Sequence, residues 1–207
     1  MSDPFLLVVA GPNGSGKTTL TRSLRAAGLD FGEYINPDDI ALDLEGSYEA
    51  RVRQAQFIAD RKRDDCLEHR RSFSFETVMS HPSKIEIMRA ARQRSFQVIL
   101  YFVATANPAV NIDRVSERVR AGGHDVPSDR IVARYFRTMA LLPDAVRAAH
   151  RTYVVDNTKR NSNGASAIRA VAEISNDHGG FQINIPDRTA LEIDWVSAAL
   201  SKIFAIE

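Results

Sequence analysis

The apolar residues of this chain form short continuous runs, separated by longer segments in which apolar residues recur at helical spacing. Phe5–Ala10 is uninterrupted and stops at a glycine, which is typical of a strand buried on both faces. Phe96–Ala104 is rich in Val, Ile, Tyr and Phe and predicts the strongest strand of the chain. Three further strands are expected at residues 33–35, 72–75 and 152–155.

Segments with helical periodicity occupy the intervals between these strands. The predicted helices span residues 17–27, 48–70, 82–94, 107–120 and 128–149, and Ser128 or Asp129 is expected to cap the last of them. Strands that alternate with helices indicate βαβ units. The pattern therefore predicts an α/β fold with three layers and a five-stranded parallel sheet.

The pattern changes after residue 160. Residues 161–164 form a polar linker, and two predicted strands at 168–174 and 181–185 flank a turn at 176–180, which indicates a β-hairpin. A short helix is expected over residues 192–204. We expect residues 1–160 to form the core, with the C-terminal hairpin and helix of residues 161–207 packed on it.

Length and charge limit the alternatives. The chain has 207 residues, 44% of them hydrophobic, and a net charge of +1, which suits one domain and favours neither nucleic acid nor a membrane as partner. A single cysteine, Cys66, excludes an internal disulfide, and the apolar runs are too short for a signal peptide or a membrane span. We therefore expect a cytoplasmic protein.

The segment that follows the first strand fits the phosphate-binding loop pattern G-x-x-x-x-G-K-[ST] at every fixed position. Its glycines let backbone N–H groups point at phosphate oxygens, the lysine adds a positive charge, and the following hydroxyl is suited to Mg²⁺. The predicted fold is thus a P-loop NTPase fold that binds ATP with Mg²⁺. The expected nucleotide-binding residues are Gly11, Pro12, Asn13, Gly14, Ser15, Gly16, Lys17, Thr18 and Thr19, with Thr18 also a metal ligand.

Carboxylates follow the second and third predicted strands, where a parallel sheet places its ligands. Asp38 is our candidate for the base that accepts the proton of an attacking hydroxyl, although Asp38 or Asp39 could instead cap a helix. Glu76 lies where a Walker B acid is found and could hold the waters of Mg²⁺ or a substrate hydroxyl. The alternative is a surface glutamate. Asp156 is expected only to cap a turn.

An arginine-rich segment lies between two predicted helices at about residues 118–130, where small kinases carry a mobile lid. Arginines there neutralise charge on the transferred phosphoryl group, and Arg118 and Arg120 are the candidates, with Arg134 on the next helix. The alternative is an ordinary basic helix end. His124 is expected to be a hydrogen-bonding loop residue rather than a catalyst.

These motifs occur in an order that resembles the zeta-toxin family, and more closely its stand-alone bacterial branch of predicted ATPases. The resemblance covers about residues 5–157. The segments that carry it are Gly11–Thr18, Ile35–Ile40, Phe75–Thr77, Arg118–Pro127 and Tyr153–Asn157.

The resemblance implies a P-loop kinase with a lid. Better-understood members phosphorylate the amino sugar of UDP-N-acetylglucosamine with ATP. Their base falls on Asp38, their substrate-binding Glu-Thr pair on Glu76 and Thr77, and their phosphate-binding arginines on Arg118 and on Arg120 or Arg134. Toxin members typically carry other residues in place of Asn36–Asp39, which leaves the sugar nucleotide and an antitoxin-like partner open.

Three functions compete at this point. The first is an ATP-dependent phosphotransferase acting on a small-molecule hydroxyl, with Asp38, Lys17, Arg118 and Arg120 as catalytic residues and Asp38, Glu76, Thr77 and Arg134 binding the substrate. The second is a nucleotide-dependent switch that acts through a protein partner. The third is a kinase of nucleic acid ends, suggested by eleven arginines between Arg89 and Arg151 but without the interleaved aromatic residues that stack bases.

Overall fold

The computed structural model describes residues 3–162, 164–177 and 180–204. Within these ranges one sheet has seven strands in the order β2-β3-β1-β4-β5-β6-β7. The strands are β1 (Phe5–Ala10), β2 (Glu33–Tyr34), β3 (Phe73–Thr77), β4 (Gln97–Ala104), β5 (Arg151–Asp156), β6 (Arg169–Asp177) and β7 (Gly180–Asn184). The first five are parallel, whereas β6 and β7 are antiparallel to their neighbours.

The five predicted parallel strands are confirmed, but a sheet of only five strands is wrong. The predicted hairpin does not stand apart from the sheet, because β6 pairs with β5 along its length from Arg151↔Ser175 to Asp156↔Arg169. A strand's own pattern reports which faces are buried, and it carries no information on which edge the strand joins. Residues 178 and 179 of the predicted turn lie outside the described residues.

The helices connect the strands as expected. They are α1 (Lys17–Ala26), α2 (Pro37–Leu42), α3 (Tyr48–Glu68), α4 (Ser83–Gln93), α5 (Pro108–Arg120), α6 (Ser128–Ala148) and α7 (Asp194–Phe204), with a 3-10 helix at Arg188–Glu192. The short α2 and the 3-10 helix were not predicted. The predicted cap of α6 is also wrong, because Pro127 occupies the N-cap position and Ser128 is the first helical residue.

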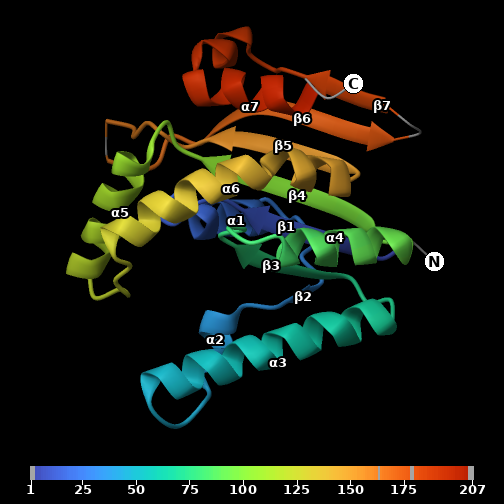
Figure 1. The fold of residues 1–207 in the computed structure, drawn as a ribbon, viewed down its shortest axis with the longest axis vertical. Helices are drawn as coiled ribbons and strands as arrows, with labels where there is room; N and C mark the ends of the chain where they lie inside the picture. The colour runs from blue at the N-terminus through green and yellow to red at the C-terminus, as the bar shows by residue number, and fades with distance from the viewer. Residues whose placement is uncertain (1–2, 163, 178–179, 205–207) are drawn as a thin grey trace.

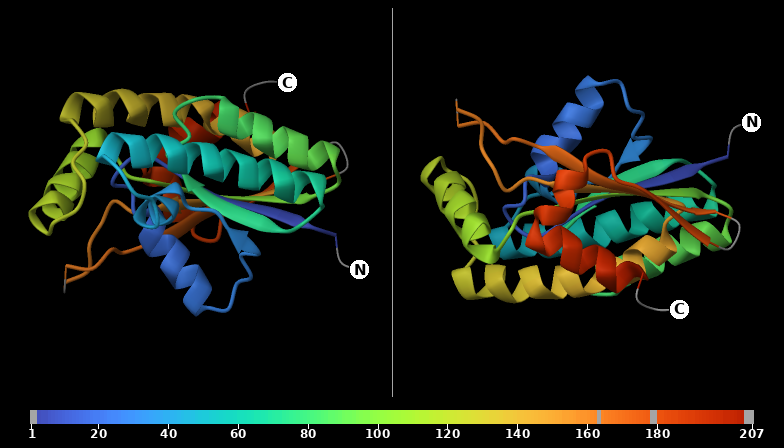
Figure 2. Two further views of the ribbon diagram at one scale, coloured as in Figure 1. Left: turned by 90° about the horizontal axis from the view of Figure 1, so that it is seen from below. Right: turned by 90° about the horizontal axis from the view of Figure 1, so that it is seen from above.

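The helices cover the sheet unequally (Figures 1 and 2). Helices α3, α4 and α6 lie over one face, and α1 lies over the other. The larger core, which includes Phe73, Phe75 and Phe102, fills the first side, and a smaller cluster around Leu7, Val9 and Leu20 fills the second. Helix α5 and residues 121–127 extend beyond the carboxyl ends of the parallel strands (Figure 1). This is the edge at which parallel sheets bind ligands. No helix of the described residues is long and apolar enough to cross a membrane.

Helix α7 is fastened to the core by one buried hydrogen bond. The indole N–H of Trp195 donates to Asp156 Oδ1 at 2.9 Å, and both residues are buried. Asp156 also accepts from the Thr158 hydroxyl at 2.5 Å, which agrees with the turn-capping role expected of it. The first of these contacts joins α7 to the end of β5.

Replacing Trp195 with phenylalanine is expected to lower the free energy of unfolding by about 1–3 kcal/mol, because Asp156 stays buried and loses a donor. The midpoint of urea unfolding measures this loss. Ser201→Ala is the control, since its hydroxyl bonds only to the Ser197 carbonyl on the exposed side of the same helix. Equal midpoints for the two variants would show that the Trp195 bond does not fasten α7.

Candidate functional site

The loop between β1 and α1 is shaped by glycines that no other residue can replace. Gly14 and Gly16 have φ angles of 73° and 97°, in the left-handed region. A Cβ on Gly16 would lie 2.2 Å from Asn157 Nδ2, and one on Gly11 would lie 2.0 Å from the Val103 carbonyl oxygen. A side chain at either position would therefore collide with another part of the protein, the backbone of Val103 at Gly11 and the side chain of Asn157 at Gly16.

Two amide side chains hold the loop in place. Asn157 is fully buried at the end of β5, and its Nδ2 donates to the Ser15 carbonyl at 2.8 Å. Asn111 of α5, also buried, donates to the Asn13 carbonyl. Sequence reasoning missed both residues as supports of the loop. The position of Asn157 directly after a buried strand was the only available signal.

Lys17 lies folded over the loop. Its Nζ donates to the carbonyl oxygens of Gly11 at 3.0 Å and Pro12 at 2.9 Å. Desolvation, with a smaller contribution from Arg118, lowers the pKa of Lys17 from 10.5 to about 8, although Glu76 and Asp38 oppose the shift. The carboxylates of Glu76 and Asp38 therefore do not fully offset the cost of burying the Lys17 ammonium group beside the phosphate-binding loop.

Glu76 connects the loop with β2. Its Oε2 accepts from the Thr18 hydroxyl at 2.9 Å, and its Oε1 accepts from the Tyr34 hydroxyl at 3.0 Å. Desolvation and the Glu76 carboxylate together raise the pKa of Tyr34. A hydroxyl and a carboxylate that meet beside the phosphate loop are oxygen ligands of the kind that Mg²⁺ takes, directly or through water. The residues present therefore fit the predicted metal site.

Asp38 is available for chemistry because another residue caps its helix. The side chain of Asn36 accepts from the Asp38 backbone N–H at 3.1 Å and is the N-cap of α2, with Pro37 in the first turn. The alternative roles of Asp38 or Asp39 as the cap are thus wrong. Asp38 lines the same cavity as Lys17 and Glu76.

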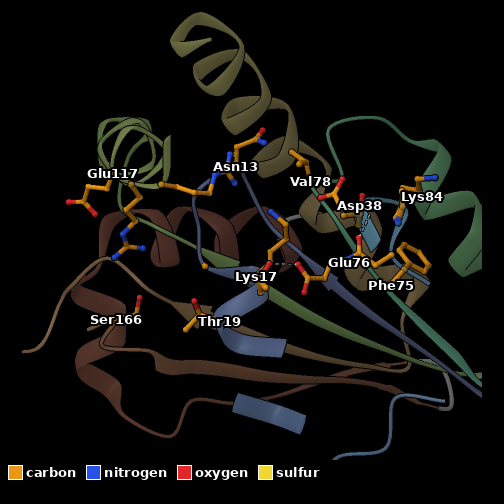
Figure 3. Close-up of a pocket in the computed structure, with 18 of the residues that line it drawn as sticks. Asn13, Lys17, Thr19, Asp38, Phe75, Glu76, Val78, Lys84, Glu117 and Ser166 are labelled. Carbon is orange, nitrogen blue, oxygen red and sulfur yellow. Dashed lines mark hydrogen bonds between the residues drawn. The ribbon is translucent and has the colours of Figure 1, made fainter. Parts of the chain in front are cut away.

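That cavity has a volume of about 570 Å³ and opens along the carboxyl edge of the sheet. Figure 3 shows Lys17 and Glu76 near its middle, with Glu117 and Ser166 on one side and Asp38, Phe75 and Lys84 on the other. The predicted site residues that line it are Asn13, Gly14, Gly16, Lys17, Thr18, Thr19, Asp38, Glu76, Thr77 and Arg118. The other predicted loop residues, Gly11, Pro12 and Ser15, are buried and do not line the cavity.

The predicted arginines are divided between different places. Arg118 lines the cavity, and its Nη2 donates to the His124 carbonyl at 2.8 Å. Arg120 is exposed and does not line the cavity among the described residues, because it lies on another face of α5. Arg134 lines a neighbouring hollow of about 230 Å³, which shares Thr77, Val78 and Lys84 with the main cavity. The structure therefore does not bring these three together.

Other lining cations were not predicted. Arg114 lies one helical turn before Arg118, and its Nη1 is buried without a hydrogen-bond partner. Arg160 lines the same side and pairs with Glu117. Arg63 of α3 and Lys84 of α4 line the opposite side. The i, i+4 spacing from Arg118 was a signal for Arg114. Nothing in the charged pattern of α3 distinguished Arg63 from its neighbours.

The ring of His124 packs against Tyr48, with 5.3 Å between ring centroids. This contact joins the predicted lid to the start of α3. The hydrogen-bonding role expected of the His124 side chain stays a prediction.

A family model described as Zeta toxin matches residues 1–170 of the chain, which include the whole cavity lining. The chain belongs to the zeta toxin family. The resemblance of its ordered motifs is thereby confirmed. A protein from Haemophilus influenzae that is described as uncharacterised is 30% identical over 129 residues, which are 60% of this chain and 88% of that protein.

Solved structures of low identity share the fold. The AvrRxo1-ORF1:-ORF2 complex with ATP has a TM-score of 0.66 at 17% identity, over 92% of this zeta-toxin chain and 63% of that one. This chain thus spans less than two thirds of that protein. The PezAT chromosomal toxin–antitoxin system of Streptococcus pneumoniae has a TM-score of 0.57 at 13% identity, over 98% and 88% of the two chains.

Proposed function

We propose that this protein transfers the γ-phosphoryl group of ATP to a hydroxyl group of a small molecule. One observation carries the proposal: a phosphate-binding loop with its lysine, a hydroxyl–carboxylate pair and an unengaged aspartate all line one cavity. Membership of the zeta toxin family supports it, as does the ATP-bound relative of the same fold.

The arrangement suits phosphoryl transfer. The loop N–H groups and Lys17 hold the phosphates, and Arg118 neutralises charge that spreads over the transferred group. Asp38 accepts the proton of the acceptor hydroxyl as its oxygen bonds to the γ-phosphorus, while the bond to the bridging oxygen of ADP breaks. Thr18 and Glu76 would hold Mg²⁺, which supplies charge neutralisation between the β- and γ-phosphates when bound.

The proposed acceptors include UDP-amino sugars, because the zeta-toxin resemblance points to them. Incubation of the purified protein with Mg²⁺, γ-labelled ATP and a metabolite pool that contains UDP-N-acetylglucosamine is expected to yield one labelled phosphomonoester and stoichiometric ADP. Mass spectrometry of the labelled product identifies the acceptor. ADP formation without any labelled organic product would contradict the proposal.

A nucleotide-dependent switch is the second candidate. The contact between His124 of the lid and Tyr48 of α3 favours it, because closure of the lid on a nucleotide would alter a surface that a protein partner can read. The PezAT structure is of a toxin–antitoxin system, so an antitoxin-like protein is the proposed partner. ATP-dependent capture of such a partner, with no transfer to any acceptor, would favour the switch.

A further inference from the structure

The side of the cavity next to Asp38 contains two cations that the proposed chemistry does not use. Arg63 comes from α3 and Lys84 from α4, and both line the cavity together with Phe75 of β3. Figure 3 shows Lys84, Phe75 and Asp38 on the same side of Lys17. A group bound by the two cations would therefore share this side of the cavity with the proposed base.

Arg63 is buried to an unusual degree for a charged residue. Its side chain is 3% exposed, although it lines the cavity. The guanidinium carbon lies 5.2 Å from the centre of the Phe75 ring, and Nη2 donates to Asp60 Oδ1 at 2.5 Å. Its Nε is buried and has no hydrogen-bond partner. A buried guanidinium with an unmet donor is costly unless a ligand completes its hydrogen bonds.

Asp60 does not neutralise this side of the cavity. The same oxygen that pairs with Arg63 also accepts from Lys84 Nζ at 3.3 Å, so one carboxylate serves two cations. The Asp60 side chain is 56% exposed, which weakens its field through solvent. Burial lowers the pKa of Lys84, and the neighbouring Arg63 lowers it further. The second effect comes from the repulsion between the two cations.

We propose that Arg63 and Lys84 form an oxyanion subsite that selects a hydroxyl-bearing acceptor with a phosphate or carboxylate group. The guanidinium of Arg63 has N–H donors beyond the one that bonds to Asp60, and Lys84 adds a mobile point charge. The anionic group would bind between α3 and α4 while the hydroxyl faces Asp38. That the bound molecule is a phosphoryl acceptor rests on the proposed function. Binding of an anion at the subsite can be measured without catalytic turnover.

The test measures anion binding while the phosphate loop is occupied. The full chain is saturated with Mg²⁺ and adenylyl imidodiphosphate, and inorganic phosphate or malonate is then titrated and followed by calorimetry. We expect one further binding event in the wild-type protein. Arg63→Met and Lys84→Met are each expected to weaken it by about tenfold or more, the usual loss for a charged hydrogen bond. The anion that binds more tightly tells whether the acceptor carries phosphate or carboxylate.

Matched control variants distinguish a loss of anion binding from a general effect on folding. Lys62→Met on α3 and Arg89→Met on α4 remove exposed cations from the same helices and are expected to leave the anion affinity unchanged. Asp60→Asn has the opposite sign: it removes the competing carboxylate and is expected to tighten anion binding. Arg63→Met also removes a buried side chain and its ion pair with Asp60. If Arg63→Met does not fold, Lys84→Met tests the subsite alone, because the Lys84 side chain is 23% exposed.

The absence of a second binding event in the wild-type protein would overturn the subsite. So would an anion affinity that Lys84→Met leaves unchanged, or that Asp60→Asn lowers. Failure of the labelled ATP assay, by contrast, would contradict the proposed function and leave the binding result intact. If phosphotransfer is found, Lys84→Met should raise KM for an anionic acceptor and leave KM for ATP unchanged.

Discussion

Replacement of Asp38 with asparagine is expected to lower the rate of phosphotransfer by about 10²–10⁴-fold, the usual contribution of a positioned base. Affinity for ATP should change little, because the phosphates bind to the loop and to Lys17. The side chain of Asn36 already caps α2, so Asp38→Asn leaves the helix start intact. Initial rates with labelled ATP, together with calorimetric titration of the nucleotide, measure the two quantities separately.

The adjacent carboxylate provides the control for this experiment. Asp39 is exposed on the same helix and does not line the cavity among the described residues, so Asp39→Asn should retain the wild-type rate. Equal rates for Asp38→Asn and the wild-type protein would remove Asp38 from the proposed mechanism.

Replacement of Lys17 with methionine is expected to weaken ATP binding by about 10–100-fold, the loss of a charged hydrogen bond, and to slow phosphotransfer further because its charge also stabilises the transition state. The pKa of about 8 adds a pH signature. In the free protein Lys17 is charged below pH 8 and loses its charge above it. ATP affinity of the wild-type protein should therefore fall as pH rises through about 8, and Lys17→Met should lack this component.

Stability without nucleotide should change in the opposite direction. The pKa of Lys17 is lower in the folded protein than its ordinary value of 10.5, so the unfolded chain holds the proton more tightly. The cost of the buried charge is fully present below pH 8 and is relieved between about pH 8 and 10.5. Lys17→Met should therefore melt at a higher temperature than the wild-type protein at pH 7, with a smaller difference at pH 10.

Lys202→Met, an exposed position on α7, is the control for both measurements. It should match the wild-type protein in ATP affinity and in melting temperature. A melting temperature for Lys17→Met that equals that of the wild-type protein at every pH would mean that the cationic lysine carries no desolvation cost. The pH dependence of ATP affinity would then need another titrating group.

Local patterns determined much of this protein. The phosphate loop was recognisable because its chemistry needs glycines and a lysine at fixed positions, and the structure places that loop between β1 and α1. The parallel strands were readable because burial on both faces leaves continuous apolar runs. Asp38 and Glu76 could be placed at one edge of the sheet because parallel strands end together. Their roles in catalysis and substrate binding stay predictions.

Only the tertiary structure decided which distant side chains meet. It placed β6 beside β5. The sequence did not predict this pairing, because the backbone hydrogen bonds at a sheet edge do not depend on which side chains a strand carries. The tertiary structure separated Arg118 from Arg120 and Arg134 through the rotation of helix faces, and it buried Arg63 against Phe75, twelve residues further along the chain. From the local sequence alone, a charged residue on a helix is expected to lie in solvent. Whether it faces a cavity depends on the packing of other elements, which no local pattern records.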